Sequence, residues 1–277
     1  MGSCFALEIQ KVLREKGRAV YPETTALRAG SQEADELVTS GLESVHFNTF
    51  TMLQEFEKAF GLWRQDPDDF WLTKRGLGGR RGAHFQDPYR RKVYAPSKEG
   101  ILALTAVLDE AIRKGIVESD LYILTMGLTE VWKKKDNGRV ACTSISDSGG
   151  GGKDQLTFYQ SGFADNYANM KKIIELIREQ FPSRHVVLTV SPVPLNRTFS
   201  KDDVFTATVE NKAVLRALAG QLVREFENVH YFPSYEFCQL LERFYGQRVF
   251  ESDGRHVRRP VVNRIMESFL NTYAASH

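Results

Sequence analysis

The chain has 277 residues, of which 42% are hydrophobic and 26% charged, as in a globular protein with a sizeable core. Basic residues exceed acidic ones by only two (37 against 35), so charge gives no reason to expect nucleic acid as a partner. No apolar run approaches the ~18 residues of a membrane-spanning helix, and the N-terminus lacks the pattern of a signal peptide. We therefore expect a cytoplasmic protein that does not bind membranes.

Cysteine and histidine spacing gives no sign of a metal centre. Cys4, Cys142 and Cys238 are widely spaced and odd in number, so they form neither a disulfide framework nor a CxxC zinc pair. We interpret Cys142 and Cys238 as structural, because unpaired cysteines usually behave as small buried side chains. Trp132 is interpreted as a core residue for its size. No metal and no bound cofactor are expected, since His84, His185 and His230 have no cysteine or carboxylate at ligand spacing.

The predicted elements begin almost at the N-terminus. Phe5, Ile9 and Leu13 recur at helical intervals and the pattern stops at Gly17, so a helix is expected to start close to residue 4. A second helix is predicted over 51–60 by the same spacing. The chain therefore begins on a turn into a helix.

The stretch from Asp66 to Ser97 breaks both the helical and the strand pattern. It is rich in glycine, proline, lysine and arginine. Such a loop could grip phosphates, but aromatic residues that would stack on bases are sparse between Lys74 and Gly82. We interpret 66–97 as a basic, Gly-rich loop excursion exposed to solvent.

Helices and short apolar strands alternate through the rest of the chain. Helices are predicted over 98–114, 166–181, 206–226 and 261–273, and strands over 121–125, 186–190 and 229–232. This alternation predicts one α/β domain with a mostly parallel sheet covered on both faces. Ligands bind at the carboxyl ends of the strands in such sheets, so the segments 126–135, 191–199 and 233–259 are where a site is expected.

Two short motifs at opposite ends of the chain could supply a nucleophile and its base. A cysteine at a turn into a helix, as at Cys4, lies near its own N–H and the positive helix terminus, which lower a thiol pKa and stabilise an oxyanion. His256 follows Asp253 by three residues, so the carboxylate can orient the ring that accepts the proton. Each motif alone is weak, because a terminal Cys is commonly buried and a DxxH pattern arises by chance. Together they predict a nucleophilic site.

The five residues Gly2-Ser3-Cys4-Phe5-Ala6 resemble the motif that names the GSCFA family, which looks like a branch of the SGNH (GDSL-type) hydrolase superfamily. Four further blocks match the family's pattern, at 47–50, 127–132, 191–193 and 253–256, so the resemblance covers nearly the whole chain. It implies a single flavodoxin-like, three-layer α/β/α sandwich over 1–277. It also implies an esterase or acyltransferase that acts on small-molecule or glycan acyl esters.

The resemblance also implies roles for individual residues. With GSC placed over the superfamily's GDS, Cys4 takes the nucleophile position and Ser3 is the alternative nucleophile. His256 would act as the base and Asp253 would orient it. Water as the second acceptor gives an esterase and a sugar hydroxyl gives an acyltransferase, and the sequence leaves both open.

The oxyanion site is expected to combine the Cys4 N–H with Asn48 and the segment that starts at Gly127. Thr129 stands where the superfamily's GxND block has asparagine, so a hydroxyl of different reach replaces an amide. This departure favours an alternative function, in which a non-catalytic descendant of the fold binds a glycan or a protein.

A second departure concerns the first strand. The superfamily places a central strand directly before the nucleophile turn, whereas only Met1 precedes Gly2 here. The sequence leaves open a truncated first strand or a sheet that lacks it, which also favours the non-catalytic alternative. The presence of Gly2, Cys4, Asp253 and His256 together favours the enzyme.

Overall fold

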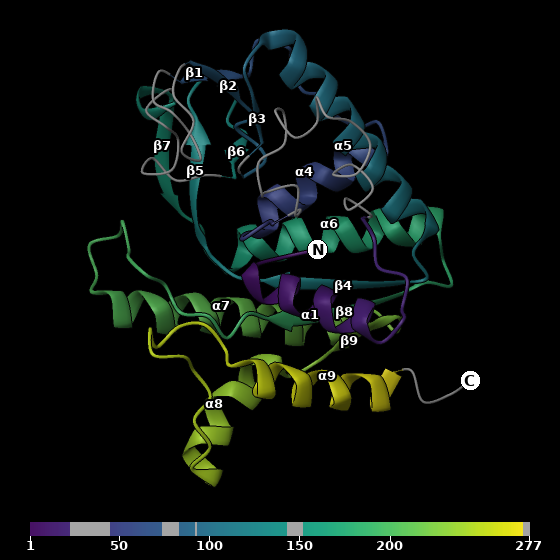
Figure 1. Ribbon diagram of the computed structural model, residues 1–277, viewed down its shortest axis with the longest axis vertical. Helices are drawn as coiled ribbons and strands as arrows, with labels where there is room; N and C mark the ends of the chain where they lie inside the picture. The colour runs from purple at the N-terminus through teal and green to yellow at the C-terminus, as the bar shows by residue number, and fades with distance from the viewer. Residues whose placement is uncertain (23–44, 74–82, 92, 143–151, 274–277) are drawn as a thin grey trace. The chain divides into compact units, whose positions relative to one another are not determined.

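A computed structural model of the chain describes residues 1–22, 45–73, 83–91, 93–142 and 152–273, and for Cys4 and Lys153 it describes the backbone alone (Figure 1). The chain divides into two compact units. The first comprises Met1–Val20, Asp120–Thr129 and Gly162–His277, and the second comprises Tyr21–Ser119 and Glu130–Ser161. The expectation of one domain over 1–277 stays a prediction.

The first unit is built on a parallel sheet with the strand order β4-β8-β9. β4 (Leu121–Met126) pairs with β8 (His185–Val190) along its whole length, and β8 pairs with β9 (Val229–Tyr231). These are the three strands that the sequence predicts, and their parallel pairing is confirmed. In β8 the residues from Val186 to Val190 are all buried, which explains why the strand is a continuous apolar run.

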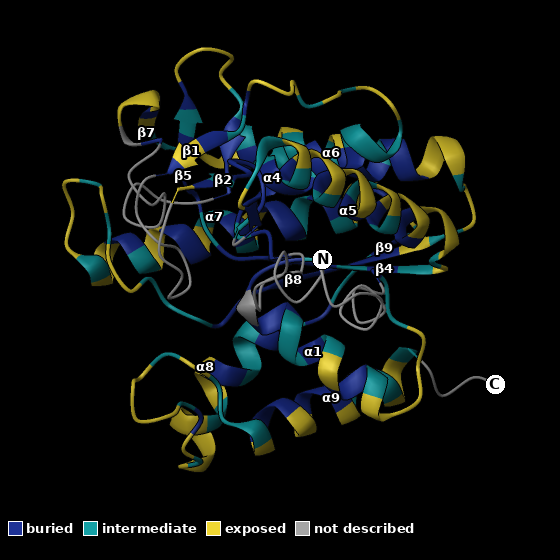
Figure 2. Ribbon diagram, turned by 45° about the horizontal axis from the view of Figure 1, so that its top comes forward, coloured by how far each residue is buried: buried dark blue, intermediate teal, exposed yellow. Residues whose placement is uncertain are grey.

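Helices cover both faces of this sheet. They are α1 (Cys4–Glu15), α6 (Phe163–Gln180), α7 (Val204–Glu225), α8 (Ser234–Tyr245) and α9 (Arg259–Tyr273). Figure 2 shows α6 and α7 on one side of the sheet and α1 and α9 on the other. The buried stripes of α6 and α7 are mainly aliphatic, as expected of helices that pack on a sheet, and that of α7 also contains Asn211 and Lys212.

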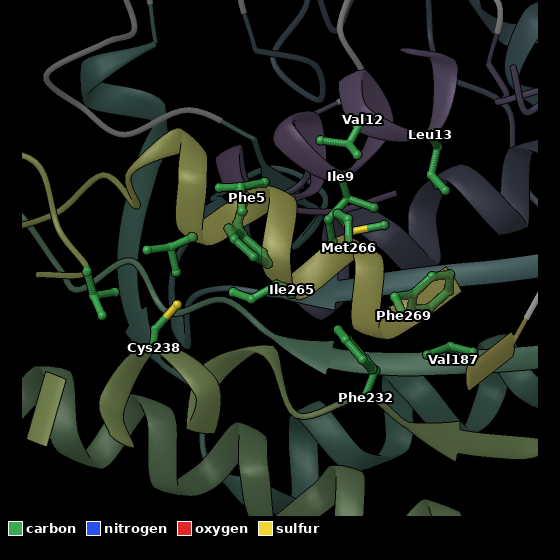
Figure 3. Close-up of a cluster of buried hydrophobic side chains, with 13 residues drawn as sticks. Phe5, Ile9, Val12, Leu13, Val187, Phe232, Cys238, Ile265, Met266 and Phe269 are labelled. Atoms are coloured by element: carbon green, nitrogen blue, oxygen red, sulfur yellow. The ribbon is translucent and has the colours of Figure 1, made fainter. Parts of the chain in front are cut away.

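The first and last helices of the chain pack together (Figure 3). Phe5 and Ile9 of α1 and Ile265 and Phe269 of α9 belong to one buried cluster that also contains Val187 of β8. Burial of a side chain of this size stabilises a fold by about 1.5–3 kcal/mol. The two ends of the chain therefore form one side of the first unit's core.

Ion pairs add to this contact at the surface. Arg259, the first residue of α9, donates to Glu8 at 3.3 Å and also to Glu15, and both acceptors lie on α1. Because these side chains are partly exposed, the pairs contribute little beyond fixing the two helices in register.

In the residues that the structure describes, the second unit contains two antiparallel sheets and two α-helices. The helices are α4 (Thr49–Ala59) and α5 (Lys98–Glu118). One sheet has the order β1-β2-β3, with β1 (Trp71–Thr73), β2 (His84–Gln86) and β3 (Tyr94–Ala95). The other has the order β6-β5-β7, with β5 (Glu130–Lys134), β6 (Val140–Ala141) and β7 (Leu156–Gln160), which follows the 3-10 turn Lys153–Gln155.

The prediction that 66–97 is an exposed loop was wrong for most of its described residues. β1, β2 and β3 all lie in it, and Tyr89 and Arg90 are buried. Arg90 binds both carboxylate oxygens of Glu55, at 2.8 and 2.6 Å, so this basic residue is neutralised inside the unit. Strands of two or three residues are too short to show alternation in a sequence. The Gly-rich run 74–82 lies outside the described residues.

The prediction of one mostly parallel sheet was also too simple. Among the described residues two of the three sheets are antiparallel, and 126–135, expected as a loop, contains β5. The end of β5 reads as polar because of Lys134, but this lysine is buried and binds Asp69. Because the lysine of this buried ion pair is polar, the hydrophobic pattern of the sequence did not indicate the strand.

The residues interpreted as structural are buried. Cys142 and Cys238 are free thiols in the interior, and burial raises the pKa of each to about 12. Trp132 packs in a cluster with Trp71, which confirms its interpretation as core. In the described part of the chain no helix combines the length and apolarity that a bilayer crossing requires.

Candidate functional site

The N-terminal turn is hydrogen-bonded to β4. The Met1 ammonium group donates to the Ile123 carbonyl at 2.8 Å, and the Thr125 N–H donates to the Met1 carbonyl at 3.0 Å. The Ser3 N–H donates to the Thr125 carbonyl at 3.3 Å, and Gly2 forms a parallel bridge with Thr125. Residues 1–3 therefore run alongside β4 and are joined to it by one parallel bridge.

Only glycine fits at position 2. The φ angle of Gly2 is 153°, a value that other residues rarely adopt. A Cβ atom there would lie 2.5 Å from the Thr125 carbonyl oxygen and 2.6 Å from the Thr125 Cβ. Close approach of the two backbones is what brings the start of α1 to the carboxyl end of β4.

α1 begins at Cys4, with Ser3 as its N-cap residue. The Ser3 side chain makes no capping hydrogen bond, and the first turn of the helix carries no acidic residue. Both features leave the positive end of the helix able to stabilise an anion. The Ser3 hydroxyl is buried and has no hydrogen-bond partner among the described residues, so no base there activates it. The Cys4 side chain lies outside what the structure describes.

The histidine motif lies on a tight turn before α9. Phe250 and Val257 form an antiparallel bridge, the Glu251 N–H donates to the His256 carbonyl at 2.8 Å, and Gly254 turns the chain with a φ of 68°. The turn is exposed to solvent. It presents the His256 ring on the outside of a short hairpin.

Asp253 and His256 are hydrogen-bonded to each other. The Asp253 Oδ2 atom bonds the His256 Nδ1 atom, and Oδ1 accepts the backbone N–H groups of Arg255 at 2.9 Å and His256 at 3.0 Å. These bonds, from the Arg255 backbone first and then from His256, hold the pKa of Asp253 well below its ordinary value. The carboxylate stays charged and fixes the ring, which leaves Nε2 for proton transfer.

The two end motifs belong to the same unit and adjoin the same hydrophobic cluster. Phe5 directly follows Cys4 and is buried in that cluster, and Val257 directly follows His256 and packs against it. Arg255 contacts the segment after β8 as well, through its Nη2 atom at 3.5 Å from the Pro194 carbonyl oxygen. Three segments that the sequence singles out are thus anchored on one unit.

The segment Gly127–Thr129 continues from the carboxyl end of β4 and is held by α7. The Lys212 Nζ atom donates to the Gly127 carbonyl at 2.9 Å. The amide of Asn211, with Nδ2 turned toward Gly127, donates to the same carbonyl and accepts from the Thr129 N–H, each at 3.1 Å. Thr129 is fully buried.

Comparison with known protein families matches residues 1–269 to the GSCFA family. The chain belongs to the GSCFA family. Its GSCFA sequence, from Gly2 to Ala6, comprises the turn that follows the Gly2 bridge to β4 and the first residues of α1, and is called the GSCFA turn below. No curated protein matches this GSCFA chain.

A solved structure shows a distant likeness to this GSCFA protein. It is described as "a putative platelet activating factor from Streptococcus pneumonia", is 14% identical, and aligns over 61% of this chain and 67% of its own with a TM-score of 0.35. At that TM-score the likeness supports no conclusion about fold or function.

Asn48 lies in the second unit of the GSCFA chain. It is the N-cap of α4, where its Oδ1 atom accepts the Thr51 N–H at 2.9 Å. The cap explains why an asparagine begins this helix, since capping is worth about 1 kcal/mol. A role for Asn48 at the oxyanion stays a prediction.

Asn211 and Lys212 are contacts that the sequence analysis of this GSCFA protein missed. A signal was present, because Asn211 stands four residues after Ala207 and four before Leu215 on the buried stripe of α7. A polar residue on such a stripe must find a partner. Among the described residues there is no group of three or more side chains that could hold a metal ion.

Proposed function

We propose that this GSCFA protein is an esterase or acyltransferase in which Cys4 is the nucleophile, His256 the base and Asp253 the residue that orients it. The observation that carries the proposal is the Asp253–His256 hydrogen bond on a turn anchored in the same unit as the GSCFA turn. A histidine fixed through Nδ1 by a charged carboxylate is suited to accept and return a proton.

The reaction has two steps. In the first, the Cys4 thiolate attacks the acyl carbonyl carbon, the carbonyl electron pair moves to oxygen, and collapse of this intermediate expels the alcohol with the proton from His256. This leaves a thioester on Cys4. In the second step, His256 takes a proton from water or a sugar hydroxyl, which attacks the thioester and releases the thiolate. Water gives an acid, and a sugar hydroxyl gives a new ester.

Two elements would stabilise the negative charges of this reaction. The first turn of α1 carries no acidic residue, and its N-cap hydroxyl is not used for capping, so the helix terminus favours a thiolate at Cys4. Gly127–Thr129 follows β4, the strand to which the GSCFA turn is bonded, so its N–H groups or the Thr129 hydroxyl are the candidates for binding the oxyanion.

The architecture of the first unit supports a resemblance to the SGNH superfamily. The turn at Gly2 pairs in parallel with β4, β4 with β8 and β8 with β9, with helices on both faces. We infer that the first unit is a three-layer α/β/α sandwich of the flavodoxin-like type. In such sheets the ligand lies at the carboxyl ends of the strands, where Cys4 and Gly127–Thr129 are found.

One observation favours the non-catalytic alternative. The Thr129 N–H already bonds the Asn211 amide oxygen, and the Thr129 side chain is fully buried, so this residue is poorly placed to donate to an oxyanion. A protein that binds a glycan or a protein with the same unit would keep the fold and need no oxyanion donors.

Turnover of p-nitrophenyl acetate by single variants separates the two functions. Cys4→Ala and His256→Ala should each lower kcat by about 100-fold or more, because nucleophile and base act as a unit. Ser3→Ala should stay close to the wild type, since its hydroxyl has no base. A wild-type protein no faster than Cys4→Ala would contradict the enzyme, and loss of turnover in Ser3→Ala alone would contradict Cys4 as nucleophile.

A further inference from the structure

Lys212 is a buried cation whose environment the core does not explain. It lies within α7 and is 2% exposed, yet no carboxylate is within ion-pairing distance of it in the part of the chain that the structure describes. Burial of an ammonium group without a counter-ion destabilises a fold relative to an apolar side chain. Packing alone would favour leucine or methionine at this position.

The Lys212 ammonium donates to the Gly127 carbonyl, which belongs to the segment that follows β4. The next residue back along the helix, Asn211, bonds the same carbonyl and the Thr129 N–H. Asn211 and Lys212, which are consecutive residues of the 22-residue helix α7, therefore bind the polar groups at the two ends of the segment, the Gly127 carbonyl and the Thr129 N–H. The segment has a fixed position relative to α7 rather than the freedom of an exposed loop.

The Lys212 bond also acts on the peptide group that it contacts. The Gly127 carbonyl and the Leu128 N–H are parts of one peptide unit, so a hydrogen bond from Lys212 to the carbonyl oxygen polarises the unit and makes the N–H a stronger donor. Oxyanion sites in acyl transfer are commonly built from such backbone N–H groups. The polarised Leu128 N–H lies at the carboxyl end of β4, the strand that bonds the GSCFA turn.

We propose that Lys212 and Asn211 are positioning residues, which fix the segment Gly127–Thr129 and make the Leu128 N–H the principal oxyanion donor of the site. The inference rests on the proposed acyl-transfer function, because it assigns a task within that reaction. It resolves the difficulty with Thr129, whose own N–H is held by Asn211. Thr129 then serves to anchor the segment, and the donor is its neighbour.

The test compares Lys212→Met with Arg216→Met. Arg216 lies one turn further along α7 and pairs with Glu236 at the surface, so its replacement removes a cation from the same helix without touching the segment. Two kinds of measurement are made on the full-length protein: amide hydrogen exchange of Thr129, and kcat and KM for p-nitrophenyl acetate. Asn211→Ala serves as a second variant with the same readouts.

In Lys212→Met we expect exchange of the Thr129 amide, whose N–H bonds Asn211, to rise about tenfold or more, while β8 and α9 keep their protection. We expect kcat to fall about 10- to 100-fold with KM little changed, because the loss concerns a transition-state contact. Arg216→Met should match the wild type in both. A structural role alone would not lower kcat in a variant that is folded at least as stably as the wild type.

Unchanged exchange in both Lys212→Met and Asn211→Ala would overturn the proposal, as would a kcat that falls no further than in Arg216→Met. If the wild type turns the ester over no faster than Cys4→Ala does, the proposed function is contradicted, and with it the assignment of Leu128 as donor. The exchange experiment needs no turnover, so it still decides whether Lys212 and Asn211 hold the segment.

Discussion

The pKa values of Lys212 and Asp253 are both lowered, but for different reasons. Burial lowers the pKa of Lys212 to about 7, which disfavours its charged form. Hydrogen bonds from the Arg255 and His256 backbone and from the His256 ring lower the pKa of Asp253, which favours its charged form. The charge on Asp253 therefore stabilises the fold, whereas the charge on Lys212 destabilises it.

This difference predicts how stability depends on pH. The ordinary pKa of a lysine is 10.5, so between about pH 7 and 10.5 the unfolded chain binds a proton at Lys212 that the folded protein has released. The free energy of unfolding should therefore rise with pH across this window, by up to ~4 kcal/mol from this group. Below about pH 7 both states are protonated and the penalty is constant.

Urea unfolding of the wild type and Lys212→Met at several pH values measures this contribution. We expect Lys212→Met to be the more stable protein at pH 7 and to lose that advantage by about pH 10. Parallel stability curves for the two proteins would show that burial does not lower the pKa of Lys212.

How far single residues could be predicted from the sequence depended on the range of their contacts. Asp253 and His256 are three residues apart, so a hydrogen bond between them follows from local geometry, and the structure contains it. Asn48 was singled out only by its motif and is a helix cap. Lys212 binds the Gly127 carbonyl, which is 85 residues away in the sequence, and no local sequence pattern indicates this contact.

Elements that bury an apolar stripe were predicted well. The helices expected over 98–114, 166–181 and 206–226 correspond to α5, α6 and α7 with small differences at their ends. α8 was missed, although Pro233 precedes it and Gly246 ends it in the left-handed conformation, because few of its residues are buried. The short strands of the second unit were missed since buried charges such as Lys134 interrupt their pattern.

The GSCFA turn is the element whose geometry depends most on one residue. In Gly2→Ala the new methyl group meets the Thr125 carbonyl, so the turn must move away from β4. Gly246→Ala is the matched control in the same unit, because Gly246 also has a positive φ but nothing lies within 4 Å of its Cβ position.

We expect Gly2→Ala to lower the free energy of unfolding by about 2–4 kcal/mol, against about 1 kcal/mol for Gly246→Ala. Thermal unfolding of the two variants measures the difference. Equal losses would show that the close approach of Gly2 to β4 is not a constraint.

At the scale of the whole molecule, the candidate site depends on joining the two ends of the chain. Residues 4 and 256 are on α1 and on the turn before α9, and the two helices share a core cluster and the Arg259 ion pairs. Sequence spacing carries no information about contacts over 250 residues. The residue types of the two motifs and the family resemblance linked them, and the fold of the first unit shows how they are anchored together.

The measurement that tests this account most directly is the pH dependence of iodoacetamide alkylation at Cys4, followed by mass spectrometry, in the wild type and in His256→Ala. Cys142 and Cys238 are internal controls, because burial raises the pKa of each to about 12 and both should stay unlabelled. We predict a Cys4 pKa well below the ordinary value of about 8.5, which rises when His256 is removed. A folded protein in which Cys4 reacts slowly, with an ordinary pKa that His256→Ala leaves unchanged, would contradict a nucleophile coupled to its base.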